Sequence, residues 1–401
     1  MADVVIVGGG PAGMMAGLLF ARAGVSTLVL EKHGDFLRDF RGDTVHPSTL
    51  RIFDELGELE TLLVRPHDEA QFLGGIIGGE KVNIADFSHL PGKCRFIALM
   101  PQWEFLDCVA NIARRYPAFQ LRMNTEAISL VEEEGRIVGV RCIEGGTEHV
   151  YRSHLVIAAD GRRSVLRGQS ALPLTDLGAP IDVFWFKLSK ARTVDNRSTG
   201  VIATGRLLAL LDRGDYWQCA FVFAKGTAEL LRAAGLQTFR DDVARAAPFL
   251  ASATAELVSW DQVRLLTVSL DRLDRWHRPG LLVIGDAAYA MSPIGGVGIN
   301  LAIQDAVAAA NILAAPLVAG VEVDPLLEQV QRRRMLPTRI VQAVQCTAQN
   351  RLIAGVVLKN VPITGAPWPV RLMQRFPVLQ RIPAYAIGIG FRSEHVRSPK
   401  A

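Results

Sequence analysis

Three glycines near the N-terminus have the spacing of a site for nucleotide phosphates. Gly8, Gly10 and Gly13 form the pattern GxGxxG directly after an apolar run at residues 4–7. In such a pattern the first glycine makes a tight turn and the second lets the backbone approach a pyrophosphate. The third lets a helix pack on a strand. That helix would begin around Pro11 and Ala12 and point its partially positive end at the phosphates.

An acid completes this motif. A second apolar run, STLVLE, ends in Glu31, where such strand–helix–strand units place the acid that binds ribose hydroxyls. The combination predicts dinucleotide binding. The acid favours a ribose without a 2′-phosphate, which fits both FAD and NAD, so the motif alone does not separate them.

A second glycine-rich stretch, GDAAYAMSPIGGVGIN, lies late in the chain at residues 285–300. Asp286 follows an apolar run and a glycine, and Asp160 stands between another apolar run and Gly161. In open α/β sheets ligands bind beyond the carboxyl ends of the strands. Both aspartates are therefore candidates for a cofactor site.

Four further segments occur in the order expected of one family. They are FRGDTVHPSTLRIFDELG (40–57), MPQWEFLDCVANIARRYP (100–117), HLVIAADGRRSVLR (154–167) and LLVIGDAAYAMSPIGGVGINLAIQDA (281–306). Together with the N-terminal motif, this set resembles the p-hydroxybenzoate hydroxylase-type FAD monooxygenases, which include ubiquinone-biosynthesis and polyketide hydroxylases. The resemblance covers about residues 1–337.

The resemblance implies the roles of several residues. Arg41 is similar to the arginine that reaches the FAD pyrophosphate or ribityl region, and Gln102 to a residue that contacts FAD at a helix start. Asp160 belongs to the motif that organises the cofactor, and Asp286 matches the acid that binds a ribityl hydroxyl. The segment along the flavin edge would comprise Pro293, Gly295, Gly296, Gly298, Ile299 and Asn300.

Few side chains are candidates for a catalytic role, because the flavin carries the chemistry in this family. Pro293 and His46 are the candidates, and His46, directly before Pro47 at an expected helix start, also fits a structural role. Arg162 and Arg163 are expected to face solvent. Tyr289 stands where the family usually has histidine. If that histidine takes part in flavin reduction, the NAD(P)H step is the one that this difference would affect.

The resemblance implies that NADPH or NADH reduces FAD transiently, and that a flavin 4a-hydroperoxide then hydroxylates an apolar aromatic substrate with O₂. A phenol, a quinone precursor and a polyketide are the substrate classes considered. Two alternatives stay open: a reductase of isoprenoid double bonds or other flavin oxidoreductase, and a flavoprotein without enzymatic activity. A halogenase is disfavoured because the chain lacks the stretch GWxWxIP.

The strands and helices expected around these residues indicate an α/β fold with a GxGxxG Rossmann-like FAD-binding domain. We expect this domain at residues 1–70, 96–172 and 274–337, with an inserted β-sheet substrate domain at 71–95 and 173–273. Alternating strands in the insert are rich in aromatic residues. Four of their side chains are expected in a substrate pocket: Phe184, Phe186, Tyr216 and Gln218.

The remaining segment, 338–401, is expected to be helical, with Pro337 bending or breaking the chain before it. Residues 351–401 hold eight Lys or Arg and one Glu, whereas the whole chain has a net charge of only +4. This distribution argues against a nucleic-acid-binding protein. The segment fits a cap on the FAD domain, a homodimer contact or a peripheral membrane contact.

Composition and residue spacing bear on membrane spans, disulfides and metal sites. The mean hydropathy is +0.22, yet no stretch is expected to span a membrane. Five scattered cysteines without a CxxC pattern indicate free thiols rather than disulfides, and the eight histidines show no metal-ligand spacing. With no signal peptide evident, we expect a cytoplasmic protein without a bound metal.

Overall fold

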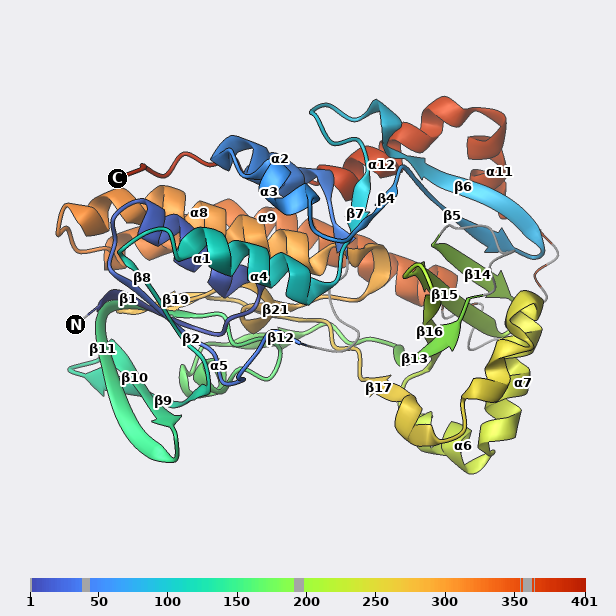
Figure 1. The fold of residues 1–401 in the computed structure, drawn as a ribbon, viewed down its shortest axis with the longest axis horizontal. Helices are drawn as coiled ribbons and strands as arrows, with labels where there is room; N and C mark the ends of the chain where they lie inside the picture. Colours follow the sequence, from blue (N-terminus) through green and yellow to red (C-terminus); the bar gives the residue numbers. More distant parts are fainter. Residues whose placement is uncertain (1, 38–43, 191–197, 354, 356–362, 364) are drawn as a thin grey trace.

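A computed structural model describes residues 2–37, 44–190, 198–353, 355, 363 and 365–401. Its first unit is a mixed eight-stranded sheet with helices against it (Figure 1). Along the sheet the strands are β19 (His277–Arg278), β20 (Leu281–Val283), β11 (Thr147–Ala158), β1 (Ala2–Val7), β2 (Thr27–Leu30) and β8 (Phe119–Arg122), with β10 (Arg136–Glu144) and β9 (Thr125–Glu133) pairing beyond β11.

Both faces of this sheet are buried. Val4 and Ile6 of β1 join the core under the helices, and Val5 and Val7 join the core of the opposite face. The helices packed on the first face are α1 (Pro11–Arg22), α4 (Gln102–Ala113), α8 (Gly298–Val318) and α9 (Asp324–Thr347). The central strands β2, β1, β11 and β20 run parallel, as βαβ units require. The predicted α/β class is therefore confirmed.

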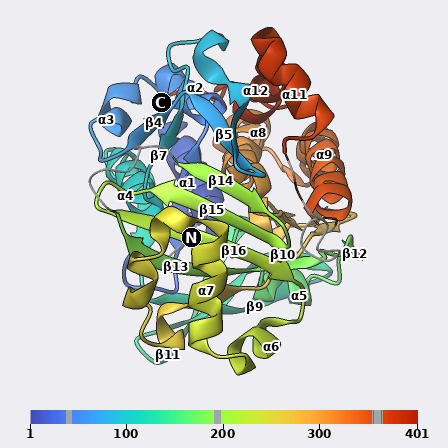
Figure 2. The ribbon, with the colours of Figure 1, turned by 90° about the vertical axis from the view of Figure 1, so that its right-hand side faces the viewer.

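The second unit is a seven-stranded sheet. Its order is β17 (Arg264–Leu266), β13 (Ile181–Ser189), β16 (Tyr216–Ala224), β15 (Arg206–Asp212), β14 (Thr199–Ala203), β5 (Phe72–Ile77) and β6 (Glu80–Asp86). Figure 2 shows α6 (Ala228–Ala233) and α7 (Leu236–Ala246) covering the outer face of this sheet. Its other face is directed towards the first unit, so a ligand between the units would meet both.

Short elements connect the two units. One three-stranded sheet joins β3 (Thr44–Val45), β7 (Ile97–Leu99) and β4 (Asp68–Ala70), and another joins β12 (Leu174–Asp176), β18 (Asp271–Leu273) and β21 (Tyr289–Ala290). The short helices are α2 (Pro47–Leu56), α3 (Leu59–Leu63) and α5 (Val165–Gln169). At the C-terminus, α11 (Trp368–Arg375) and α12 (Arg381–Gly388) lie beside β6.

Two helices differ from expectation. α9 does not end at Pro337 but continues to Thr347, across the predicted boundary at 337. A proline inside a helix removes one backbone hydrogen bond, but here α9 is held along its length by packing on α8 and by side-chain bonds to neighbouring loops. Within the described residues, 294–318 are long and apolar enough to cross a membrane, but 72% of the apolar window is buried inside the fold.

Candidate active site

The N-terminal turn is built so that backbone, not side chains, faces the ligand. A Cβ on Gly8, whose φ is +107°, would lie 2.4 Å from the carbonyl oxygen of Ala159, and one on Gly13 would lie 1.9 Å from that of Gly8. At Gly10, by contrast, a Cβ would meet nothing within 4 Å. The α1 N-terminus behind this open space has no side-chain cap. Two glycines therefore serve packing, and Gly10 leaves room in front of an uncapped helix end for an anion.

Glu31 braces the same turn. Its carboxylate accepts hydrogen bonds from the backbone N–H of Gly9 at 2.8 Å and of His33 at 3.0 Å. The side chain is buried beside the glycines, at the end of β2. Its contact with a ribose stays a prediction.

The late loop meets the early turn directly. A Cβ on Gly285, whose φ is +60°, would lie 3.1 Å from the Cβ of Ala12 and 3.2 Å from that of Ala302. Pro11 and Ala12 begin α1, as expected, so the late loop touches the first turn of this helix. Two glycine-rich segments far apart in sequence thus share one site.

Arg162 corrects a prediction. It does not face solvent freely: its Nε donates to Asp286 Oδ2 at 3.0 Å, and Nη2 donates to the carbonyl oxygen of Met291 at 3.4 Å. Its Nη1 is buried without a hydrogen-bond partner among the described residues. Sequence reasoning missed this arginine because its partner lies more than a hundred residues away.

Asp160 begins the loop that carries Arg162. It accepts hydrogen bonds from the hydroxyl of Ser164 and, at 3.5 Å, from the N–H of Leu166 at the start of α5. Burial raises the pKa of this carboxyl above its ordinary value, although the hydrogen bonds oppose the shift. In this structure Asp160 therefore organises a helix start next to the site.

Beyond Asp286 the late loop turns at two left-handed glycines. Gly295 has φ +78° and Gly296 has φ +60°, and a Cβ on Gly296 would lie 2.3 Å from the hydroxyl oxygen of Thr44. That hydroxyl donates to the carbonyl oxygen of Gly296 at 2.9 Å. Pro293 precedes this turn, and Ile299 packs partly buried against the main core.

α8 then begins at Gly298, without a side-chain cap or an acid in its first turn. Two uncapped helix N-termini, those of α1 and α8, therefore flank the loop, and both favour negative charge.

The side chain of Asn300 is fully used inside the protein, so a contact of this residue with the cofactor stays a prediction for its backbone. Its Oδ1 accepts from the N–H of His46 and the hydroxyl of Thr49, both at 2.8 Å. Its Nδ2 donates to the carbonyl oxygens of Thr44 at 3.0 Å and Gly296 at 3.2 Å. An amide has two donors and two acceptor lone pairs, so this side chain has none left for a cofactor. It binds the late loop to the start of α2.

His46 lies at that helix start and is buried. Its Nδ1 is 2.8 Å from the carbonyl oxygen of Ile387, so Nδ1 carries the proton that it donates to this acceptor. Nε2 is left as an acceptor, buried and without a partner among the described residues. Burial lowers the pKa to about 4. The ring is therefore neutral at pH 7, and a catalytic role stays a prediction.

The remaining predicted cofactor residues are Gln102 and Arg41. Gln102 is the first residue of α4, and its Oε1 is buried without a hydrogen-bond partner among the described residues. Arg41 lies outside the described residues. Orphaned polar atoms on Gln102 and Arg162, open space at Gly10 and two uncapped helix ends together fit a large anionic ligand with many polar groups, as FAD is.

Comparison with known proteins decides the family. A model of the "FAD binding domain" family matches residues 1–344. The chain belongs to this FAD-binding family.

Among curated relatives, 6-methylpretetramide 4-monooxygenase of Streptomyces rimosus is 32% identical over 99% of this chain and 94% of its own. Aklavinone 12-hydroxylase of Streptomyces peucetius is 26% identical over 90% of this chain and 77% of its own.

A solved structure shares the fold. PqsL of Pseudomonas aeruginosa, described as a probable FAD-dependent monooxygenase, superposes with a TM-score of 0.74. It is 22% identical to this chain, and the match covers 90% of this chain and 99% of PqsL. The chain is thus an FAD-dependent oxidoreductase of the aromatic monooxygenase class, as the resemblance implied.

In this FAD-binding fold, Tyr289 is not placed at the cofactor but inside the core behind the late loop. Its hydroxyl donates to Asp305, and its ring packs against Trp276 with the centroids 5.2 Å apart. Burial raises the pKa of this phenol well above its ordinary value. Asp305 also accepts from the N–H of Gly285 at 3.2 Å and forms a fully buried ion pair with Arg334 at 2.9 Å. Tyr289 therefore supports the root of the loop.

Glutamines on α9, which the sequence analysis did not single out, hold the far side of the late loop. Gln345 accepts from the N–H of Ser292 at 3.1 Å and donates to the carbonyl oxygens of Ser292 and Ile294, both at 3.0 Å. One turn earlier, Gln342 donates to the carbonyl oxygens of Asp271 and Ala290. Glutamines three residues apart on one helix face were the available signal, but their loop partners could not be read from the sequence.

The second sheet corrects half of the pocket prediction. Phe184 and Phe186 are fully buried under α7, where their rings contact Phe239 at centroid distances of 5.8 and 5.3 Å. Strand alternation gives two faces but not which one a helix covers, so the sequence could not assign them. Tyr216 and Gln218 are cross-strand partners of Ser189 and Lys187, and they share the other face with Ala220.

That other face meets the late loop. Ile294, like Trp185 and Ala209, packs against the buried cluster that contains Ala220. The face of the sheet that meets the late loop is therefore the one that carries Trp185 rather than Phe184.

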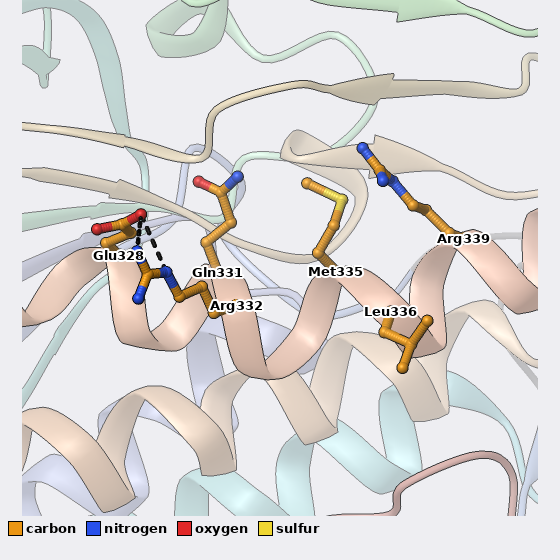
Figure 3. A pocket seen from close by; sticks show the side chains of 6 residues that line it. All are labelled: Glu328, Gln331, Arg332, Met335, Leu336 and Arg339. Carbon is orange, nitrogen blue, oxygen red and sulfur yellow. Dashed lines mark hydrogen bonds and ion pairs between the residues drawn. The ribbon is translucent and has the colours of Figure 1, made fainter.

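Two surface hollows lie away from all these residues. One, with a volume of about 290 Å³, follows the outer side of α9 and is lined by Glu328, Gln331, Arg332, Met335, Leu336 and Arg339 (Figure 3). The other, about 640 Å³ and widely open, is lined by Asp241, Ala244, Arg245 and Pro248 of α7 and the turn after it. Neither contains a residue of the candidate cofactor site.

Proposed function

We propose that the protein hydroxylates a planar, polycyclic aromatic compound of the polyketide type, with NADPH or NADH as the transient reductant. Reduced FAD would supply the electrons with which one atom of O₂ enters the ring while the other leaves as water. The relatives named above act on compounds of this kind by their names, 6-methylpretetramide and aklavinone.

One observation carries the substrate class. On the face towards the late loop, Trp185, Ala220, Ala209, Gly200 and Gly75 are successive cross-strand partners on five neighbouring strands. Four of these five residues have a hydrogen atom or a methyl group as side chain, and a Cβ on Gly200 would meet nothing within 4 Å. A row of this kind carries little side-chain volume on this face of the sheet, which suits a fused ring system better than a bulky, branched molecule.

A polar group is available beside this row. Gln218 is 4% exposed and stands next to Ala220 on the same face. Its Oε1 accepts from Arg213 Nε at 3.1 Å, whereas Nε2 has no hydrogen-bond partner among the described residues. A buried donor without a partner is costly, so we assign Nε2 to a keto or phenolate oxygen of the substrate.

Different parts of the chain would then bind the cofactor and orient the substrate. The early turn and α1 would hold the pyrophosphate, Arg162 and Asp286 would bind the ribityl chain, and Gly295, Gly296 and the start of α8 would line the flavin edge. The second sheet excludes water and orients the ring. Homodimer formation and the cytoplasmic location stay predictions.

The test is substrate-stimulated oxidation of NAD(P)H by the FAD-loaded protein, with product analysis across single-ring phenols and fused three- and four-ring phenols. We expect stimulation and hydroxylated product with the fused rings. Ala209→Leu should remove that activity and leave bound FAD unchanged, whereas Ala251→Leu, at an exposed position, should have no effect. Stimulation by single-ring phenols alone would contradict the substrate class.

A further inference from the structure

The two C-terminal helices form an exposed surface that the reaction does not use. Of the large hydrophobic side chains exposed on the described part of the chain, seven lie between residues 368 and 391: Trp368, Leu372, Phe376, Val378, Ile382, Tyr385 and Phe391. Trp368 and Ile382 are 70% and 67% exposed. A group of this size on one short segment is unusual for a surface that meets only water.

The inner faces of these helices are firmly attached. Val370 of α11 packs against Val82 of β6, and the Gln374 side chain both accepts from and donates to the backbone of Asn83. Ala384 of α12 lies in a cluster with Phe87 directly after β6. Both helices therefore contact one strand, β6, and carry exposed side chains on the rest of their surface (Figure 1).

The same outer surface is cationic. Arg371, Arg375 and Arg381 are exposed, and none forms an ion pair or a side-chain hydrogen bond with any residue that the structure describes; Arg375 lies 6.0 Å from the ring centroid of the neighbouring Phe376. The sequence has no acid between residues 351 and 393. Both acids of β6 have other partners: Glu80 accepts from the N–H of Ala366 at 3.2 Å, and Asp86 accepts from the N–H of Ser88 at 2.9 Å.

We infer that this surface, which we call the α11–α12 face, binds an anionic lipid bilayer peripherally. Exposed Trp, Leu and Ile side chains would enter the region between headgroups and acyl chains, and the arginines would pair with lipid phosphates. A symmetric contact with a second copy is disfavoured, because it would bring the same three unpaired arginines together. The inference does not depend on which ring the enzyme hydroxylates.

Sedimentation of the FAD-loaded, full-length protein with vesicles tests this. We expect binding to phosphatidylcholine vesicles rich in phosphatidylglycerol to be at least ~10-fold tighter than to pure phosphatidylcholine, and to weaken as salt is raised. The triple variant R371Q/R375Q/R381Q should lose the preference, and Trp368→Ser should weaken binding. Exposed positions elsewhere provide controls with matched charge and polarity, R152Q/R264Q/R332Q and Val258→Ser, which should bind as the unmodified protein does.

Retained FAD and an unchanged melting temperature show that each variant is folded. Absence of binding to anionic vesicles, or equal binding to neutral ones, would overturn the inference. A protein that forms dimers dispersed by Trp368→Ser and Ile382→Ser, without binding vesicles, would also overturn it and would assign the face to a second copy.

Discussion

Gly10 and Gly13 stand three residues apart in one motif and serve different ends. A methyl group on Gly13 would collide with the backbone of Gly8, whereas one on Gly10 would enter open space. The backbone of Gly10 is extended, with φ −75°, a conformation that alanine also adopts. The two glycines can therefore be separated by experiment.

Gly10→Ala should leave the melting temperature of the FAD-free protein unchanged and weaken FAD binding by at least ~10-fold, about 1.4 kcal/mol, because the methyl group takes the room of the pyrophosphate. Gly13→Ala should lower the melting temperature itself. Fluorescence titration with FAD and thermal unfolding measure the two effects. Unchanged FAD affinity in Gly10→Ala would mean that the phosphates lie elsewhere.

His46 gives a prediction about pH. Its pKa of about 4 in the folded chain is below the ordinary value of 6.5, so protonation favours the unfolded chain. Its contribution to stability is complete above pH 6.5 and is lost as the pH falls towards 4. Between pH 7.5 and pH 5 this group should account for about 2 kcal/mol of lost unfolding free energy. Urea unfolding of His46→Gln should show a correspondingly flatter pH dependence, and equal slopes for both proteins would refute the assignment.

Single residues show most clearly which features of the site could be predicted from the sequence. The glycine turn, the helix start at Pro11 and the strand end before Glu31 were predictable because they depend on local chain geometry. Arg162, Asn300 and the glutamines of α9 were not, since their roles depend on partners brought close only by the tertiary fold. The same holds for Phe184, whose face was decided by the position of α7.

At the scale of elements, α9 acts as a support for the late loop. Gln345→Leu would leave one N–H and two carbonyl groups of the loop without partners, and each buried unsatisfied group costs ~1–3 kcal/mol. We expect FAD affinity to fall by about 10-fold.

Gln331→Leu is the matched control on the same helix. Gln331 also binds main chain, accepting from the N–H of Trp276 and donating to the carbonyl oxygen of Asp274, but neither partner belongs to the loop at residues 285–300. It should lower the melting temperature comparably without weakening FAD binding. If both variants bind FAD equally well, α9 does not position the cofactor.

For the whole molecule, a buried chain of charges connects the C-terminus to the root of the late loop. Glu394 accepts from Arg334 at 3.3 Å, Arg334 pairs with Asp305 at 2.9 Å, and Asp305 accepts from the N–H of Gly285. Arg334 and Asp305 are fully buried. The last residues of the chain thereby stabilise a loop about a hundred positions earlier.

Arg334→Met should lower the free energy of unfolding by ~3–5 kcal/mol, because the fully buried Asp305 loses its cationic partner, whereas Glu394 keeps its ion pair with Arg333. The double variant R334M/D305N should recover part of this loss, since it also removes the Asp305 carboxylate that would be left buried without Arg334. Chemical unfolding followed by flavin and tryptophan fluorescence measures both. A single variant as stable as the parent protein would show that the network carries little energy.

The central claim, that the early turn, the late loop and the open sheet face form one hydroxylating site, is tested most directly with isotopically labelled O₂. The FAD-loaded protein would be given NAD(P)H, labelled O₂ and a fused-ring phenol, and the product analysed by mass spectrometry. Our account predicts one labelled oxygen atom in the aromatic product. NAD(P)H consumption with only hydrogen peroxide formed, or product oxygen derived from water, would contradict it.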